Sequence, residues 1–229
     1  MLYCDRCARR TCASASVEGL PEVCPTRDAD ARRRAARAYE GDDLLVSAAS
    51  HVATRDGYGW ATRVEEVMLY AARAGARRIG VAFCITLARE ARAFCDILRD
   101  NGFAVSSVMC KAGALPREAL GVPEACDVLP GMASALCDPV GQAQLLNAEG
   151  TDLNVVVGLC VGHDSLFFRH SDAPATCLVV KDRMTGHNPL APVYQHEGAF
   201  HRVHRMDLPE ALDPSFSSDA GLRRGGRAR

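Results

Sequence analysis

The sequence predicts an α/β fold: an open, Rossmann-like, mostly parallel sheet with helices on both faces, preceded by a small cysteine-rich segment. Three observations predict this fold. Short apolar runs of strand length recur within residues 76–182 and alternate with helical patterns. These runs are nearly continuous in apolar character, which is typical of parallel strands covered on both faces. Four of the 11 cysteines lie in the first 27 residues, where hydrophobic periodicity is weak.

Composition divides the chain of 229 residues into three segments. Residues 1–27 form the cysteine-rich segment, which we expect to bind metal, and residues 28–206 form the α/β domain. Residues 207–229 end in a stretch rich in Ser, Gly and Arg, a composition that buries too little apolar surface to fold. A disordered tail is therefore expected there.

Residues 28–75 are expected to be helical. A first helix is expected over about 43–55. Thr62 and Glu65 form a capping box that starts the next helix, because the hydroxyl and the carboxylate each satisfy an amide that has no partner within the helix. Apolar residues then recur at helical spacing as far as Gly75, which ends the helix.

The strands are expected where apolar and β-branched residues cluster, at 79–83, 103–109, 153–159 and 175–180. Between the first two strands, Thr86 is expected to cap a helix that ends at Asn101. Asp138 and Pro139 are expected to start another helix, as its cap and its first-turn proline.

Charge and hydropathy exclude several classes of partner. The net charge is −1, so no general attraction to nucleic acid or to an anionic membrane is expected. The first residues lack a basic region followed by an apolar stretch, and no run of about 18 apolar residues occurs, so neither a signal peptide nor a membrane span is expected. We therefore expect a cytoplasmic protein with reduced cysteines. The oligomeric state is not indicated.

The N-terminal cysteines have the spacing of a metal site. Cys4, Cys7, Cys12 and Cys24 form the pattern C-x2-C-x4-C-x11-C. A C-x2-C pair lets two thiolates of one turn hold the same metal, and two further cysteines complete a shell of four sulfurs. Zinc and an iron–sulfur cluster both accept four thiolates, so the spacing leaves both open. The alternative is that these thiols bind nothing.

A second set of cysteines occupies a repeated position. Cys84, Cys110 and Cys160 each close a predicted strand, and Cys137 precedes the helix start at Asp138. Ligands of open parallel sheets bind beyond the carboxyl ends of the strands, so these four side chains are expected to converge there as metal ligands. The alternative is that they fill the core, where free cysteine is common. Cys95, Cys126 and Cys177 are interpreted as non-ligands.

Polar residues are expected to share that edge of the sheet. Gly162 would let the backbone approach a ligand, and His163 with Asp164 would be the catalytic residues. His163 could instead be a metal ligand or a cap, and Asp164 a helix cap. Lys181 and Arg183 would bind an anion, with Asp182 orienting one of them, or would form a solvated loop. Lys111 would stabilise the thiolate of Cys110.

Several strings over residues 4–194 occur together in a known family. They are Cys4-x-x-Cys7 with Cys12 and Cys24-Pro25, Thr62-Arg63-Val64-Glu65-Glu66, Gly80-Val81-Ala82-Phe83-Cys84, Cys110-Lys111, Gln142-Ala143, the run from Thr151 through Gly162-His163-Asp164-Ser165 to Phe167, Val180-Lys181-Asp182-Arg183 and His187-Asn188-Pro189. They resemble the bacterial and archaeal family catalogued as domain of unknown function 1847. The resemblance implies metal binding through cysteines and assigns no reaction. The chain departs from the family pattern at Thr86, where glycine is expected, and at Asp138, where asparagine is expected.

Three functions are compatible with these patterns. In the first, the strand-end cysteines hold an iron–sulfur cluster, of the 4Fe-4S type, and the N-terminal set holds a second cluster that relays electrons from a redox partner; the protein would then be an iron–sulfur oxidoreductase. In the second, zinc stabilises the N-terminal segment and the crevice binds a small anionic molecule. In the third, His163 activates Cys160 as a nucleophile. The substrate is not indicated.

Overall fold

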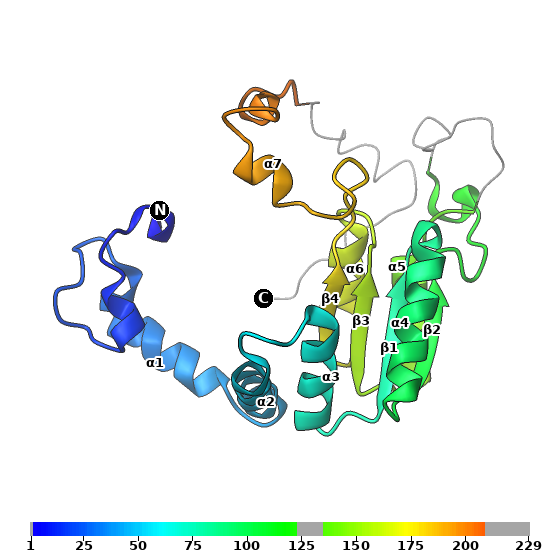
Figure 1. Ribbon diagram of the computed structural model, residues 1–229, viewed down its shortest axis with the longest axis horizontal. Coiled ribbons are helices and arrows are strands. Elements are labelled where there is room, and N and C mark those ends of the chain that lie inside the picture. Colours follow the sequence, from blue (N-terminus) through cyan, green and yellow to red (C-terminus); the bar gives the residue numbers. More distant parts are fainter. Residues whose placement is uncertain (1, 123–134, 209–229) are drawn as a thin grey trace.

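The computed structural model describes residues 2–122 and 135–208, and its centre is a four-stranded, wholly parallel sheet (Figure 1). The strands are β1 (Arg78–Phe83), β2 (Ala104–Met109), β3 (Leu153–Val157) and β4 (Ala175–Val179). Their order across the sheet is β2-β1-β3-β4. The predicted α/β class is therefore confirmed.

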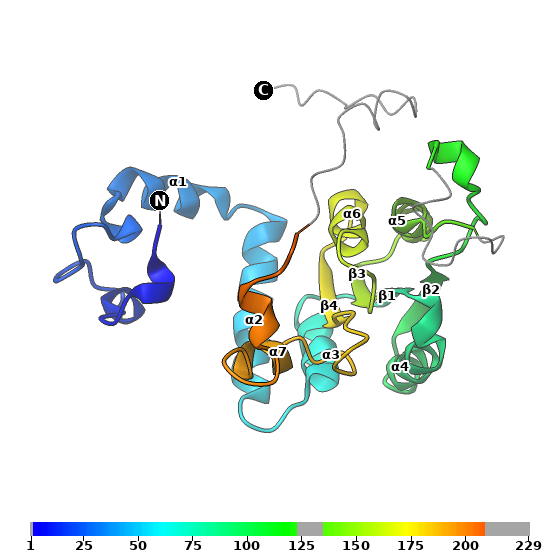
Figure 2. The same ribbon diagram turned by 90° about the horizontal axis from the view of Figure 1, so that it is seen from above.

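Helices surround this sheet. They are α1 (Ala29–Ala38), α2 (Asp42–Gly57), α3 (Arg63–Arg73), α4 (Ala88–Asp100), α5 (Pro139–Ala148), α6 (His163–His170) and the short α7 (Ala191–Tyr194). Seen from above, α3 and α4 cover one face and α5 and α6 cover the other (Figure 2). Helix α2 packs against α3 beside the β4 edge (Figures 1 and 2).

Two apolar cores follow from this layering. On one face Val67 of α3 and Phe94 of α4 pack against the strand residues Val81 and Val155. On the other face Leu146 of α5 belongs to a second cluster, which also contains the buried Cys84 and Cys110. Successive residues of a strand point to opposite faces of the sheet, and both faces are buried here. Nearly every strand position is therefore apolar, as the sequence shows.

The chain reverses its direction across the sheet between β1 and β3. From β1 it runs outward through α4 to β2, and α5 then carries it back past β1 to β3. From β3 it continues outward the other way, through α6 to β4. The carboxyl ends of β1 and β3 therefore border a topological switch point, the place where open α/β sheets bind ligands.

Most of the expected elements are confirmed. Thr62 and Glu65 make both bonds of the capping box at the start of α3. The side chain of Asp138 accepts a hydrogen bond from the amide of Gly141 (2.7 Å), and Pro139 opens α5. The third strand ends at Val157, earlier than expected.

The expected cap at Thr86 is wrong. This residue lies within a short 3-10 turn, Ile85–Leu87, and α4 begins only at Ala88. Its hydroxyl instead contacts the ammonium of Lys181 and the sulfur of Cys84. Of the other sequence-based expectations, Cys126 and the tail from residue 209 onwards lie outside the described residues.

A buried asparagine is accommodated in the central strand β3. Asn154 is fully buried and accepts a hydrogen bond from the hydroxyl of Thr151 (2.8 Å) while donating one to that of Ser171 (2.8 Å). Its side chain occupies the space beside Gly80 on β1, where an added Cβ would lie 2.0 Å from the asparagine Oδ1. Glycine is therefore required in this strand by close packing, although its backbone is extended.

None of the helices in residues 2–122 and 135–208 combines the length and the apolar character needed to cross a lipid bilayer.

The substitution Gly80→Ala is expected to destabilise the fold by about 1–3 kcal/mol, because the methyl group overpacks the site of Asn154. Urea unfolding followed by circular dichroism measures this change. Gly198→Ala is the matched control, since its Cβ would meet no atom closer than 3.4 Å. Equal midpoints for the two variants would contradict the packing argument.

Candidate functional site

The carboxyl edge of the sheet, where the ligand crevice was expected, collects side chains from five parts of the chain. The loops after β1, β2 and β3 and the residues before α5 contribute one cysteine each, Cys84, Cys110, Cys160 and Cys137 respectively. The loop after β4 contributes Lys181 and Arg183. Hydrogen bonds and charge effects among these side chains place them at one edge, as the strand-end pattern predicted.

Three thiols form a contiguous group. The sulfurs of Cys110 and Cys137 are 3.8 Å apart although 27 residues separate them in sequence. The Cys110 side chain also raises the pKa of Cys84, which places Cys84 near this pair. Cys84 and Cys110 are buried, and Cys137 is partly exposed. The amide of Ile85 also donates to the sulfur of Cys110 (3.4 Å), a contact that favours a negatively charged sulfur.

The three thiols differ in how readily they lose a proton. The hydrogen bond to Cys110 and burial raise the pKa of Cys84 to about 12. The hydrogen bond with Cys137 and burial likewise raise the pKa of Cys110. The hydrogen bond with Cys110, assisted by the charge of Lys111, lowers the pKa of Cys137 to about 7. The group therefore carries one thiolate near neutral pH, on Cys137, and resists a second.

Cys160 stands at the same edge beside a cation. Its sulfur accepts a hydrogen bond from the guanidinium of Arg183 (3.3 Å), and this bond raises the pKa of Arg183. Its charge partly opposes the lowering of the Cys137 pKa, which indicates that the fourth thiol shares the crevice with the other three.

Within the described residues the crevice cations lack a carboxylate partner. Lys111, Lys181 and Arg183 form no ion pair with a carboxylate there. Lys181 is only 8% exposed, and its ammonium donates to the hydroxyl of Thr86 (2.5 Å), which lies 3.3 Å from the sulfur of Cys84. Since a buried cation is costly without a counter-charge and the thiol of Cys84 keeps its proton, Lys181 favours a negative charge at this edge.

The loop that presents Arg183 is closed by its own hydrogen bonds. The carboxylate of Asp182 accepts from the amides of Met184 (2.9 Å) and Thr185 (3.2 Å), so it shapes the turn and does not orient Lys181 or Arg183 as expected. The amide of Asp182 donates to Nδ1 of His187 (3.1 Å), whose backbone has a positive φ of 70°. His187 thus acts in the loop rather than in the crevice.

The expected catalytic pair has mainly structural contacts. His163 opens α6, its amide donates to the carbonyl of Cys160 (2.9 Å), and burial lowers the pKa of its imidazole. Asp164 accepts from the amides of Gly162 (3.0 Å) and Ser165 (2.7 Å). Gly162 supplies the positive φ (86°) that the turn requires. Asp164 therefore stabilises the start of α6 from inside its first turn.

The N-terminal cysteines share one cavity. Cys4, Cys7, Cys12 and Cys24 all line a cavity of about 350 Å³. They are held by three short 3-10 turns, Cys4–Arg6, Thr11–Ser14 and Pro25–Arg27. In both views this segment lies beyond α1 and α2, away from the crevice (Figures 1 and 2).

Within residues 2–122 and 135–208, no group of three or more His, Cys, Asp or Glu side chains is placed so that it could hold a metal ion as it stands. The donor chemistry of both cysteine sets nevertheless suits a thiophilic metal or an iron–sulfur cluster. At the crevice the uncompensated cations also suit the negative charge of a metal–thiolate centre.

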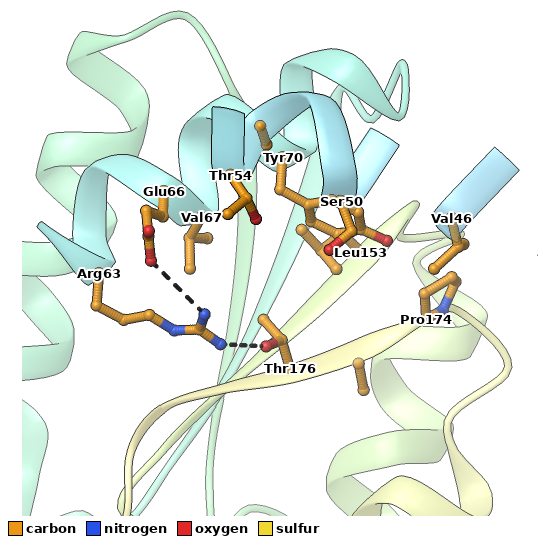
Figure 3. A pocket seen from close by; sticks show the side chains of 12 residues that line it. Val46, Ser50, Thr54, Arg63, Glu66, Val67, Tyr70, Leu153, Pro174 and Thr176 are labelled. Carbon is orange, nitrogen blue, oxygen red and sulfur yellow. Dashed lines mark hydrogen bonds and ion pairs between the residues drawn. The ribbon is translucent and has the colours of Figure 1, made fainter. Parts of the chain in front are cut away.

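A further cavity was not anticipated from the sequence. It measures about 270 Å³ and lies between α2, α3 and the β4 edge, with Ser50, Thr54 and Tyr70 on its wall (Figure 3). Arg63 crosses it to bond the hydroxyl of Thr176 (2.8 Å), which fastens α3 to β4. No motif marks this cavity, because its polar residues are single positions on amphipathic helices.

Two contacts at the crevice were also missed. The Lys181–Thr86 bond joins residues 95 positions apart. The second contact is the side chain of Gln142, which is 1% exposed and reaches the ends of two strands. Only the polar character of a residue inside an apolar helix face could have marked Gln142 in the sequence.

The chain has relatives among known proteins. Residues 24–178 match the family described as "Protein of unknown function (DUF1847)". "Uncharacterized protein MJ0455" of the archaeon Methanocaldococcus jannaschii is 38% identical over 153 residues, which cover 67% of this chain and 77% of the relative. No solved structure matches the chain. The matched region contains all four crevice cysteines, and the chain belongs to the DUF1847 family.

Proposed function

We propose that this protein is a cysteine-ligated metal protein with two sites. The crevice site consists of Cys84, Cys110, Cys137 and Cys160 and holds a redox-active iron–sulfur centre. The N-terminal four-cysteine cavity holds a second metal centre. The observation that carries the proposal is the approach of thiols from separate segments at the switch point of the sheet, with the sulfurs of Cys110 and Cys137 3.8 Å apart.

The protonation of the thiols supports a cation between them. Cys84 and Cys110 keep their protons near neutral pH, because their thiol neighbours and burial raise the pKa of each. With the thiolate of Cys137 beside them, they resist further ionisation. A metal ion removes this repulsion, because it binds thiolates and displaces their protons. The crevice therefore gains most from a ligand that carries positive charge to the sulfurs.

The surroundings support a redox role for that centre. Ala82, Val156 and Phe167 pack around Cys84 and Cys110, and they limit the access of water. The amide of Ile85 donates to the sulfur of Cys110. Solvent exclusion and hydrogen bonds to ligating sulfurs are two of the means by which proteins set cluster potentials.

A second candidate is a module in which zinc, and not a cluster, binds at the crevice as well as at the N-terminal segment, and a small anion binds beside the crevice zinc. The separation of Cys110 and Cys137 is 3.8 Å, and two thiolates on one tetrahedral ion with bonds of about 2.3 Å lie about 3.8 Å apart. A 4Fe-4S cluster takes one thiolate per iron, so these two sulfurs would have to separate to bind it. The exposed Arg183 would then receive the anion.

The composition of the anaerobically purified protein is expected to distinguish the two candidates. Iron with matching acid-labile sulfide supports the first, and zinc alone supports the second. Triple replacement of Cys84, Cys110 and Cys137 by Ala is expected to remove the crevice share of the metal and leave the N-terminal share. Cys95→Ala, a buried thiol of α4, is the matched control. Metal contents that do not depend on either cysteine set would contradict the proposal.

Alkylation of the metal-free protein is expected to depend on pH. Because the thiolate is the reactive form and the pKa of Cys137 is lowered to about 7, its reaction with iodoacetamide should rise as the pH increases through about 7. Cys84, with its pKa raised to about 12, should stay unreactive over that range. Lys111→Gln should move the Cys137 profile to higher pH, since the Lys111 charge favours the thiolate. Peptide mass spectrometry measures both rates, and equal profiles for the two cysteines would contradict the assignment.

The N-terminal segment is expected to depend on metal for its order. In residues 2–27, Leu20 is the only buried hydrophobic residue, so this part of the chain has almost no apolar core of its own. Chelation, or the pair Cys7→Ala and Cys12→Ala, should therefore expose residues 2–27 to trypsin while the α/β domain stays intact. Protection that is identical with and without metal would show that the segment folds without it.

A further inference from the structure

Gln142 connects the three segments that carry the contiguous thiols. It lies on α5, one helical turn after Asp138, and its amide bonds the carbonyl of Asp138 (3.0 Å). Its side-chain nitrogen donates to the carbonyls of Phe83 (3.3 Å) and Val108 (2.7 Å). Phe83 precedes Cys84 directly, Val108 lies two residues before Cys110, and Asp138 follows Cys137.

The backbone near the thiols is held independently of this side chain. The amide of Cys110 donates to the carbonyl of Phe83 (2.9 Å), and that of Asp138 donates to the carbonyl of Cys110 (2.8 Å). The carbonyl of Phe83 would thus have a partner without Gln142. The side chain adds a direct link from the start of α5 to the ends of β1 and β2, beyond what the backbone bonds supply.

This link carries a cost. The Oε1 atom of Gln142 is buried, and it is the one such side-chain nitrogen or oxygen without a partner in the part of the chain that the structure describes. An unsatisfied buried acceptor destabilises a fold, and a methionine would fill a similar volume without that cost. Packing alone therefore does not account for a glutamine at this position, whereas the two donated bonds do.

We propose that Gln142 is a positioning residue, which sets the separation of the Cys84, Cys110 and Cys137 sulfurs and so the affinity and geometry of the crevice metal centre. The effect of Gln142 on metal binding rests on the proposed function, whereas the positioning of the thiols is a property of the metal-free protein. Gln142 does not contact the metal itself; it acts through the backbone next to the cysteines that bind the metal.

Gln142→Met tests the proposal, because it keeps the volume and removes both donated bonds. Gln142→Glu is the second variant, since an ionised carboxylate repels the two carbonyls. Leu146→Met is the matched control, a buried, volume-conserving change one turn along the same helix. Urea unfolding should show Gln142→Met to be about as stable as the control, so that any effect on the thiols is not a general loss of folding.

The first readout uses the metal-free protein in a chelator and a glutathione buffer. Cys110 and Cys137 form a disulfide as they give up two protons and two electrons, and one glutathione disulfide accepts them to become two glutathione molecules. The equilibrium fraction of the Cys110–Cys137 bridge, identified by mass spectrometry, reports how the two sulfurs are held. We expect Gln142→Met to change this equilibrium by about tenfold, the size expected for the loss of one or two hydrogen bonds.

The second readout is cobalt(II) binding, followed by its sulfur-to-metal absorption bands. Affinity at the crevice should fall about tenfold in Gln142→Met and stay unchanged in Leu146→Met, for the same reason. If the disulfide equilibria of Gln142→Met and Leu146→Met are equal, Gln142 does not position the thiols and the inference is overturned. If wild-type protein binds no metal at the crevice while Gln142→Met still shifts the disulfide equilibrium, the proposed function fails and the positioning role stands.

Discussion

The reversal of the chain between β1 and β3 is the constraint on which the crevice depends. Because every strand is parallel, the loops that follow β1, β2 and β3 all emerge at one edge, and the reversal puts a topological switch point there. Cysteines separated by 23 to 76 positions can then approach one another without any local motif. The close packing of Gly80 against Asn154 keeps β1 and β3 together beneath this switch point.

The charges of the crevice complement one another. Lys181 is buried beside Thr86 and Cys84, and Arg183 contacts Cys160 at the rim. Lys181 is costly to bury without a counter-charge, whereas Arg183 is exposed. The same arrangement that favours one thiolate opposes several, so the protein alone does not complete the balance of charge there.

The sequence was sufficient to predict the features that depend on local pattern or on topology. The strands, the capping box at Thr62 and the convergence of the strand-end cysteines follow from apolar runs and from the parallel arrangement they imply. The third strand ended early because Gly158 has a positive φ of 65°, which an apolar run does not reveal. The contacts of Thr86 and Gln142 depend on side-chain geometry between distant segments, and no spacing in the sequence encodes it.

Helix α1 has a consequence for how the two cysteine sets relate. It buries none of its residues and connects the N-terminal segment to α2, so no continuous path of packed side chains joins the two sets along it. Occupancy of one set would then leave the affinity of the other unchanged, and the chain would behave as two separate thermodynamic units. Under the proposed function, a chain short of metal would therefore fill its tighter site first and persist as a half-loaded species.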